Sequence, residues 1–162
     1  MINCVFFDWD ATLAKPGSRD IFMHNLDLIT RLQTLDPHAL GILGYLRSKG
    51  IKIGIITNTK KDHLVFEKAL HETGLTNFIN PELIFISSDP RYCAKPCPQI
   101  FQAALRESGC SPAETLFVGD SCWADVQGAQ GVGMKVAYLN RRSCRFRGDY
   151  HLHELSQLVY IV

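Results

Sequence analysis

The sequence has no large excess of charge of either sign. Its 17 lysine and arginine residues nearly balance its 16 aspartate and glutamate residues, which leaves a formal net charge of +1. Proteins with a general affinity for nucleic acids or membrane surfaces usually have a strong basic bias. The balanced charge therefore argues against both roles and favours a small ligand as the partner.

The sequence also lacks an apolar run long enough to span a membrane, and it has no internal repeat or low-complexity segment. No basic region precedes the short apolar run near the start, as a secretion signal would require. We therefore expect a cytoplasmic protein with no membrane association. With 162 residues and 46% hydrophobic side chains, the chain is long enough for one sizeable core, and we expect a single domain over residues 1–162.

The cysteines lack the regular spacing of a disulfide framework, so the sequence predicts free thiols. They are Cys4, Cys93, Cys97, Cys110, Cys122 and Cys144. Cys93 and Cys97 have the form of half a zinc-binding loop. A structural zinc site needs about four ligands, however, and no Cys-x-His or Cys-x-Cys partner lies nearby.

Short apolar runs alternate with segments of helical periodicity along the chain. Strands are expected at residues 2–7, 51–56, 83–86, 115–118 and 134–139. Helices are expected at about residues 21–35, from 37 toward 50, at 61–72 and 98–108, around 125 toward 131, and at 151–158. This alternation predicts an α/β fold, a Rossmann-like three-layer sandwich with a central parallel sheet of about five strands.

Two carboxylates follow the first predicted strand directly, namely Asp8 and Asp10. A carboxylate at a strand end can act as a nucleophile toward a phosphoryl group, and a second one two residues later can hold the same metal ion or move a proton. Ligands of parallel sheets bind at the carboxyl ends of the strands. Thr57 and Asp120 also fall at such ends, and Lys95 follows the third strand.

Four short motifs on these elements resemble those of the haloacid dehalogenase superfamily. They are Asp8-Trp9-Asp10-Ala11-Thr12-Leu13, Thr57-Asn58, Lys95-Pro96, and Gly119-Asp120 with Asp125. The resemblance covers about residues 2 to 139 with the motifs in the right order and spacing, which is far more specific than any one motif alone. It implies a Mg²⁺-dependent phosphatase that hydrolyses a phosphomonoester through an aspartyl-phosphate intermediate.

The resemblance also implies a catalytic or substrate-binding role for most motif residues. Asp8 would be the nucleophile, and Asp10 would act as general acid and then as general base. Thr57, with Asn58 beside it, would hold phosphoryl oxygens through its hydroxyl and neighbouring backbone N–H groups. Lys95 would reduce the repulsion between the nucleophile and the phosphate.

The implied Mg²⁺ site comprises Asp8, Asp120 and the main-chain carbonyl of Asp10. Asp125 would support it by reaching metal-bound water or Lys95. Hard oxygen ligands suit Mg²⁺ far better than zinc. Each of these residues, taken alone, also has an ordinary structural explanation, and for Asp125 that explanation is a carboxylate on a helix surface. Their occurrence together favours the functional interpretation.

One position departs from the usual pattern of the superfamily. Ala11 stands where glycine is often found. If the turn requires a positive φ, the Cβ atom costs on the order of 1 kcal/mol, so we expect altered fine geometry rather than lost activity. Trp9 is expected to be a packing residue, and Thr12 is either a structural hydroxyl or a direct participant.

Substrate choice in this superfamily depends largely on cap insertions. Residues 14–36 leave room for only a short cap-like insertion, and residues 59–94 are already used by a predicted helix, loop and strand. Three polar residues of the insertion are candidates for substrate contact: Arg19, His24 and Asn25. The sequence therefore predicts a capless or minimal-cap phosphatase, whose open site admits bulky substrates or is closed by a neighbouring subunit of a homo-oligomer.

The predicted substrate is a small phosphorylated metabolite. The acid at Asp10 favours phosphate-ester hydrolysis over carbon–halogen cleavage, because dehalogenases of the superfamily lack an acid there. A phosphatase specialised for a protein or nucleic-acid end is an alternative that the open site and a basic run would permit. That run consists of Arg141, Arg142, Arg145 and Arg147. A non-catalytic interaction module on the same fold is the second alternative.

Overall fold

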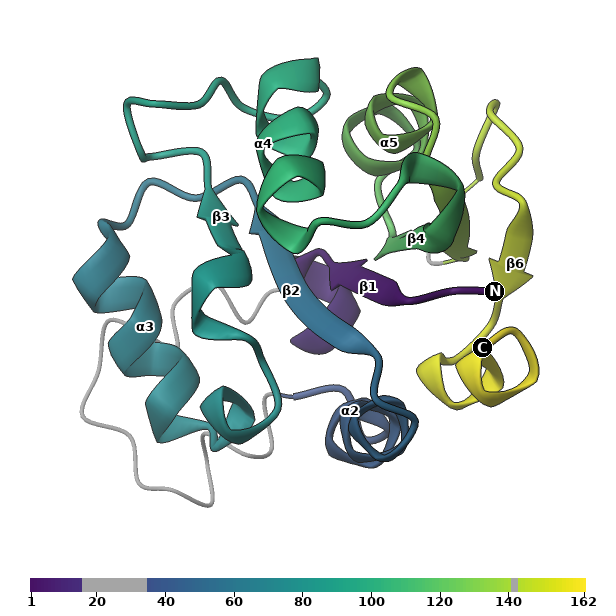
Figure 1. Ribbon diagram of the computed structural model, residues 1–162, viewed down its shortest axis with the longest axis horizontal. Coiled ribbons are helices and arrows are strands. Elements are labelled where there is room, and N and C mark those ends of the chain that lie inside the picture. The colour runs from purple at the N-terminus through teal and green to yellow at the C-terminus, as the bar shows by residue number, and fades with distance from the viewer. Residues whose placement is uncertain (16–34, 141–142) are drawn as a thin grey trace.

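The computed structural model describes residues 1–15, 35–140 and 143–162. A parallel sheet with the strand order β3-β2-β1-β4-β5-β6 forms its centre (Figure 1). The strands are β1 (Cys4–Phe7), β2 (Lys52–Thr57), β3 (Ile84–Ile86), β4 (Thr115–Gly119), β5 (Lys135–Leu139) and β6 (Tyr150–Leu152). The nucleophile candidate therefore follows a strand with neighbours on both sides.

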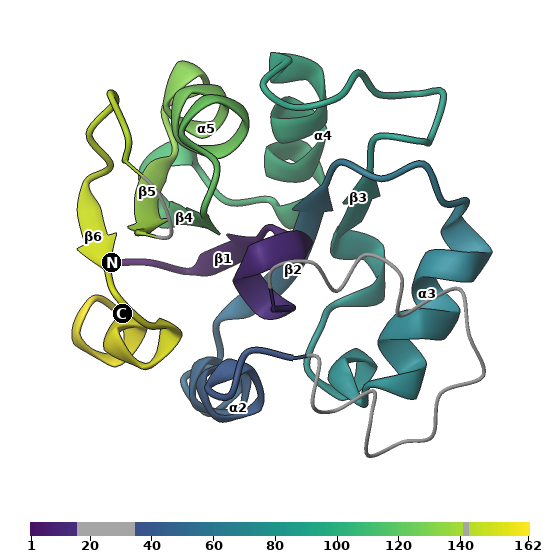
Figure 2. The same cartoon turned by 180° about the vertical axis from the view of Figure 1, so that it is seen from behind.

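Helices cover both faces of this sheet, which gives the three layers that the alternating pattern predicts. The helices are α2 (Ala39–Ser48), α3 (His63–Glu72), α4 (Pro98–Ser108) and α5 (Gly128–Gly131). Shorter helical turns are η1 (Trp9–Leu13), η3 (Leu75–Asn77), η4 (Pro81–Leu83), η5 (Pro112–Glu114), η6 (Cys122–Gln127) and η7 (Leu155–Tyr160). α4 and α5 lie on one face, while α2 and η7 lie on the other (Figures 1 and 2).

The central strand β1 shows why the core has two halves. Val5 and Phe7 belong to the cluster that includes α2 and η7, whereas Cys4 and Phe6 belong to the cluster that includes α4. Successive side chains of a strand point to opposite faces, so a strand covered on both sides must be apolar throughout. Asp8 comes next and continues the ladder, because its backbone N–H donates to the carbonyl of Val118 at 2.9 Å.

The chain after β5 differs from the expected structure. The sequence predicts a helix over residues 151–158, but residues 150–152 form a sixth strand that pairs in parallel with β5. Its three residues are too few to show an alternating pattern, so tertiary pairing decides their conformation. The helical turn η7 begins only at Leu155, where Leu155 and Leu158 are both buried against the sheet.

The cap-like insertion predicted at 14–36 lies largely outside the described residues. The helix expected at about 21–35 and the three polar candidates Arg19, His24 and Asn25 are among those residues, as are Arg141 and Arg142 of the basic run. The two described ends of the insertion meet, because Ala14 and Leu35 form an antiparallel bridge and Asp36 N–H donates to the Leu13 carbonyl at 2.8 Å.

No cap domain is inserted between β2 and α4, a region that is described throughout. The chain there forms α3, short helical turns and β3, which continue the sheet and its covering layers. Across the described ranges, the helices are too short or too polar to cross a membrane.

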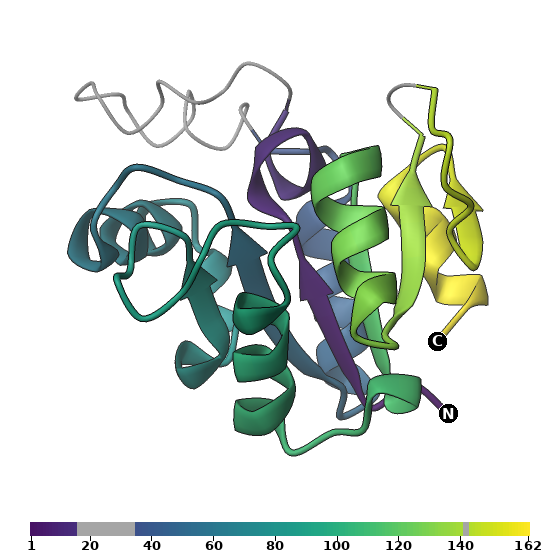
Figure 3. The ribbon, with the colours of Figure 1, turned by 90° about the horizontal axis from the view of Figure 1, so that it is seen from above.

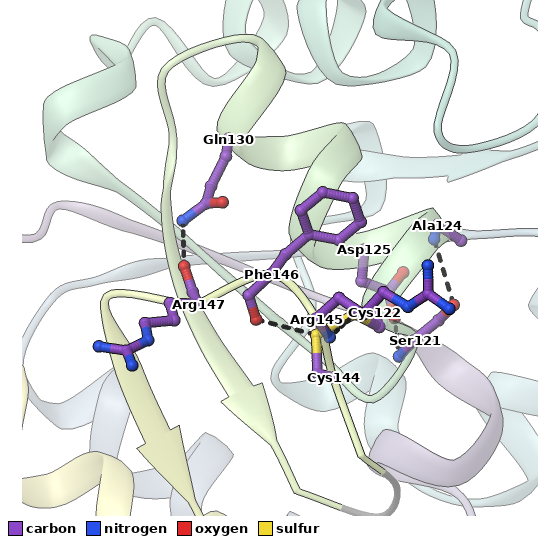
Figure 4. Close-up of a disulfide and its surroundings, with 9 residues drawn as sticks. All are labelled: Ser121, Cys122, Ala124, Asp125, Gln130, Cys144, Arg145, Phe146 and Arg147. Carbon is purple, nitrogen blue, oxygen red and sulfur yellow. Dashed lines mark hydrogen bonds between the residues drawn. A yellow bond between two sulfur atoms is a disulfide. The ribbon is translucent and has the colours of Figure 1, made fainter.

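Four of the six cysteines form disulfides, so the prediction of free thiols is wrong for these four. Cys93 pairs with Cys97, and Cys122 pairs with Cys144. The second pair is distant in sequence, but β4 and β5 are adjacent parallel strands, so the loops that follow them come together. The two Cα atoms lie 5.1 Å apart, within the usual range for a disulfide (Figure 4).

The pairing of Cys93 with Cys97 agrees with the argument against a zinc site there, because both sulfur atoms are taken up by one bond. The two remaining cysteines are free, with Cys4 buried and Cys110 half-buried. Burial raises the pKa of the Cys4 thiol to about 12. The thiol therefore stays protonated and behaves as a small apolar side chain of the core.

Candidate active site

The parallel strands end at one edge of the sheet, where the turn η1 follows β1 (Figure 3). An open pocket of about 1140 Å³ lies there. All seven residues predicted for the site line it: Asp8, Asp10, Thr57, Asn58, Lys95, Asp120 and Asp125. They come from the carboxyl end of β2 and from the segments that follow β1, β2, β3 and β4, so the fold brings together residues that are far apart in the sequence.

The floor of the pocket is a buried cluster of three charges. Lys95 Nζ donates to Asp8 Oδ1 at 2.7 Å and to Asp125 Oδ1 at 2.6 Å. The exposed fraction is 7% for Asp8, 5% for Lys95 and 1% for Asp125. Buried charges are tolerated only when they are paired and hydrogen-bonded, as these are. The arrangement fixes a cation beside one oxygen of the Asp8 carboxylate.

Burial and charge act on the floor residues in opposite ways. Burial raises the pKa of Asp8 to about 6, although Lys95 opposes that shift and Asp125 adds to it. Burial alone would lower the pKa of Lys95, but the carboxylates of Asp125 and Asp8 outweigh it and raise that pKa above its usual value. Lys95 is therefore protonated throughout the neutral pH range.

Asn58 holds the backbone of Lys95 in place. Its Nδ2 donates to the Lys95 carbonyl at 3.0 Å, and the Lys95 N–H donates to Asn58 Oδ1 at 2.9 Å. This pair of hydrogen bonds joins the end of β2 to the loop that carries the cation. The sequence predicts Asn58 as a substrate-binding residue, and this role stays a prediction; the residue lines the pocket, and its side chain contacts the Lys95 backbone. The pairing could be found only from the structure, because nothing local in the sequence links the two residues.

Asp125 is placed by a close approach of its carboxylate to Gly119. A Cβ atom at residue 119 would lie 2.4 Å from Asp125 Oδ2, so only glycine fits there. The same Oδ2 accepts a hydrogen bond from Ser121 N–H at 2.9 Å. With 1% exposure, Asp125 is not a carboxylate on a helix surface. The glycine of the Gly119-Asp120 motif thus has a steric role.

The turn after β1 adopts the left-handed conformation at Ala11, with φ of 61°. The turn therefore requires a positive φ at this residue, and the Cβ atom of alanine costs about 1 kcal/mol there. Trp9 is 4% exposed and packs edge-on against Phe66, with ring centroids 5.7 Å apart, which agrees with a packing role. Thr12 is fully buried and does not line the pocket, which favours the structural interpretation.

Three carboxylates of the site could hold a metal ion. Oxygen atoms from Asp8, Asp120 and Asp125 all lie within 4.8 Å of one another. A set of hard oxygen donors beside an open pocket fits Mg²⁺, which keeps several water ligands and uses few protein carboxylates. Zinc would favour nitrogen or sulfur ligands, and none belongs to this cluster.

The sheet and the acid cluster at its carboxyl edge define an α/β protein with a site suited to phosphoryl chemistry. The family of haloacid dehalogenase-like hydrolases matches residues 4–133. The chain belongs to this family, which confirms the resemblance carried by the four motifs.

Curated relatives of the chain include several phosphatases. The pyrophosphatase PpaX of Bacillus pumilus is 30% identical over 145 residues, which cover 86% of this chain and 62% of that protein. A glyceraldehyde 3-phosphate phosphatase of Pyrococcus furiosus is 26% identical over 168 residues, which cover 87% of this chain and 70% of that protein. A phosphoserine phosphatase of Thermus thermophilus is 33% identical over 111 residues, which cover 68% of this chain and 43% of that protein. The chain thus spans only part of the length of each relative.

Solved structures share the fold at lower sequence identity. A HAD phosphatase from Thermococcus onnurineus matches with a TM-score of 0.78 and 23% identity, covering 99% of this chain and 97% of that one. A 2-haloacid dehalogenase from Pseudomonas syringae matches with a TM-score of 0.78 and 19% identity, covering 99% and 98%. These likenesses extend the common fold over nearly the whole chain.

Proposed function

We propose that the protein is a Mg²⁺-dependent phosphatase that hydrolyses a small phosphomonoester through Asp8. The observation that carries the proposal is the buried cluster of Asp8, Lys95 and Asp125, in which a fixed cation contacts the carboxylate at the pocket floor. A purely structural module has no need for three paired charges facing an open pocket. Relatives that are named as phosphatases of small molecules support the same class of substrate.

In the proposed reaction, Asp8 and Asp10 divide the chemistry. A carboxylate oxygen of Asp8 forms a bond to phosphorus, and the bond between phosphorus and the leaving oxygen breaks. Asp10 donates its proton to that leaving oxygen. Asp10 then accepts a proton from water while the water oxygen bonds to phosphorus, and inorganic phosphate leaves Asp8. The two steps regenerate the free Asp8 carboxylate and the protonated Asp10.

The other site residues bind the phosphoryl group and the metal ion and orient the Asp8 carboxylate. Lys95 holds one oxygen of the Asp8 carboxylate and reduces its repulsion with the phosphate. Thr57 is buried at the pocket and would contact a phosphoryl oxygen through its hydroxyl. Asp8 and Asp120 would hold Mg²⁺ with the carbonyl of Asp10, and Asp125 would support them. When bound, the ion supplies positive charge to the phosphoryl oxygens.

Hydrolysis of p-nitrophenyl phosphate with and without Mg²⁺ tests the proposal. Asp8→Asn should lower kcat by at least about 1000-fold, because it removes the nucleophile. Glu107→Gln is the matched control, since it removes a carboxylate that is exposed and outside the pocket, and it should leave kcat unchanged. Circular dichroism must show that both variants are folded. A folded Asp8→Asn variant within tenfold of the unchanged protein would rule out the mechanism.

We also propose a single domain over residues 1–162, with residues 14–36 as a minimal cap. The expectation of a cytoplasmic protein stays a prediction. The two disulfides bear on it, because stable disulfides are rare in the reducing cytosol of most organisms. A thiol count on protein isolated from its own cell, under conditions that block exchange, would give four additional reactive thiols if both bonds are reduced there.

A further inference from the structure

One wall of the pocket carries an exposed aromatic side chain. The large apolar side chains that are exposed in the described residues are Met1, Leu40, Leu64, Val65, Trp123 and Tyr160. Of these, only Trp123 lines the pocket, and 59% of its surface is exposed. An indole in water at the edge of a binding pocket offers a large apolar area for contact with a ligand.

The backbone on both sides of Trp123 is fixed. Cys122 is bonded to Cys144, and its Sγ accepts a hydrogen bond from Arg145 N–H at 3.1 Å (Figure 4). On the other side, Ala124 N–H donates to Ser121 Oγ at 3.2 Å. The indole therefore stands on a turn whose conformation is set before a ligand arrives, and such preorganisation lowers the entropic cost of binding.

A second aromatic ring packs beside Trp123 in the described part of the chain. The ring of Phe146 lies 6.5 Å from that of Trp123 at an interplanar angle of 43°. Figure 4 shows Phe146 in the loop that the disulfide joins to η6, the turn that carries Trp123, so the same covalent bond links the two segments that carry the rings. Trp123 stays mostly exposed despite this contact, so the residue keeps accessible surface at the pocket.

The position of Trp123 along the chain relates it to the reaction. It lies between Asp120 and Asp125, the two acids that follow β4, and it lines the same pocket as Asp8. A phosphoryl group bound at the pocket floor directs its leaving group outward, toward the rim. A leaving group that extends along the β4 side of the pocket would reach Trp123, which lines the same pocket.

We propose that Trp123 is a specificity-determining residue that stacks against a flat ring in the leaving group. The preferred substrates are then aryl or heterocyclic phosphomonoesters, in preference to small aliphatic ones. The inference rests on the proposed function for the orientation of the substrate. It goes beyond it by naming the chemical class of the leaving group.

Binding to a variant that cannot turn over gives the first test. In the Asp8→Asn background with Mg²⁺, calorimetry would measure the Kd of phenyl phosphate, of a nucleoside monophosphate and of glycerol 3-phosphate. Trp123→Ala should raise the Kd of the ring-bearing ligands about fivefold to tenfold and change that of glycerol 3-phosphate by less than twofold. Trp123→Phe should restore most of the loss. Tyr160→Ala removes another exposed aromatic ring, one outside the pocket, and should change no Kd.

Equal losses for ring-bearing and aliphatic ligands would assign Trp123 a structural role and overturn the inference, as would no loss at all. If only one of phenyl phosphate and the nucleotide depends on Trp123, the dependence identifies which ring the site accepts and supports the proposal.

Turnover by the protein with Asp8 intact separates this inference from the proposed function. Trp123→Ala should raise KM for phenyl phosphate with little change in kcat, because it removes binding to the leaving group that is common to ground and transition states. If the protein hydrolyses none of the esters but Trp123→Ala still weakens phenyl phosphate binding, the proposed function fails and the stacking role stands. If the protein hydrolyses all of the esters and Trp123→Ala leaves the ratios of their KM values unchanged, the proposed function stands and the stacking role fails.

Discussion

The floor and the rim of the pocket are built by different means. The floor consists of Asp8, Lys95 and Asp125, which are buried, and Lys95 donates a hydrogen bond to each of the two carboxylates. The rim carries Asp120, which is half-buried, and Trp123, which is mostly exposed. The buried floor charges must be paired in the folded state, so the same residues determine both stability and catalysis. Changes at the rim should alter ligand binding while leaving the folded state nearly intact.

Removal of the floor cation is the strongest test of this difference between floor and rim. Lys95→Met leaves Asp8 and Asp125 buried without a positive partner, which should cost about 3–5 kcal/mol of unfolding free energy. Urea denaturation at neutral pH measures the loss, and p-nitrophenyl phosphate turnover should fall by at least about 1000-fold. Lys60→Met at the exposed rim is the control and should change stability by less than about 0.5 kcal/mol. Equal costs for the two variants would contradict the distinction.

At the rim, Asp120→Asn should remove the response to Mg²⁺. An ion at about 100 times its Kd stabilises the folded state by about 2.7 kcal/mol, which is measured as a rise in Tm. The variant should lose that rise, because one of three clustered carboxylates is gone, while its metal-free Tm stays close to that of the unchanged protein. Glu107→Gln removes an exposed carboxylate elsewhere and should keep the full response. A persistent Mg²⁺-dependent rise in Asp120→Asn would exclude this acid from the site.

The close approach of Gly119 to the Asp125 carboxylate can be tested by substitution. Gly119→Ala places a Cβ atom against the Asp125 carboxylate and should cost about 1–3 kcal/mol, the usual range for overpacking. Gly41→Ala is the matched control, because nothing lies within 4 Å of the added atom and alanine favours the helix. Urea denaturation should therefore give opposite signs for the two substitutions. Destabilisation by both would mean that the approach to Asp125 is not the cause.

The smallest effect concerns the turn η1, which follows Asp8. Ala11→Gly should raise the unfolding free energy by up to about 1 kcal/mol, because it relieves the positive φ. Ala14→Gly lies in extended backbone three residues later and should lower stability by about 0.5–1 kcal/mol, since glycine gains nothing there. The two urea midpoints should shift in opposite directions. A loss of stability in Ala11→Gly would show that the strain is compensated by contacts of the Cβ atom.

The acids that directly follow a strand were predictable from the local sequence, whereas Lys95 and Asp125 were predicted through the resemblance to the four motifs. Asp8 interrupts a wholly apolar strand, and Gly119-Asp120 ends another in the same way. A parallel sheet brings such strand ends to one edge, so the grouping follows from the order of elements. The order and spacing of the four motifs then indicated the family, and the family match bears this out.

Features that depend on contacts between distant segments could not be predicted. β6 is too short for a pattern, and it becomes a strand because it pairs with β5. The bond between Cys122 and Cys144 follows from the adjacency of β4 and β5, which the spacing of the cysteines does not encode. The contact of Asn58 with the Lys95 backbone likewise joins two loops that meet only in the folded protein.

The position of β1 in the middle of the sheet has a consequence for synthesis on the ribosome. β1 is made before both of its neighbours and has to wait for them, since Cys4 lies opposite Lys52 on one side and Thr115 on the other. Pairings between such distant segments close slowly, and the apolar faces of β1 stay uncovered in the meantime. The charge cluster is complete only when Asp125 has left the exit tunnel. A nascent chain that stops short of that residue contains the nucleophile but not the pocket floor.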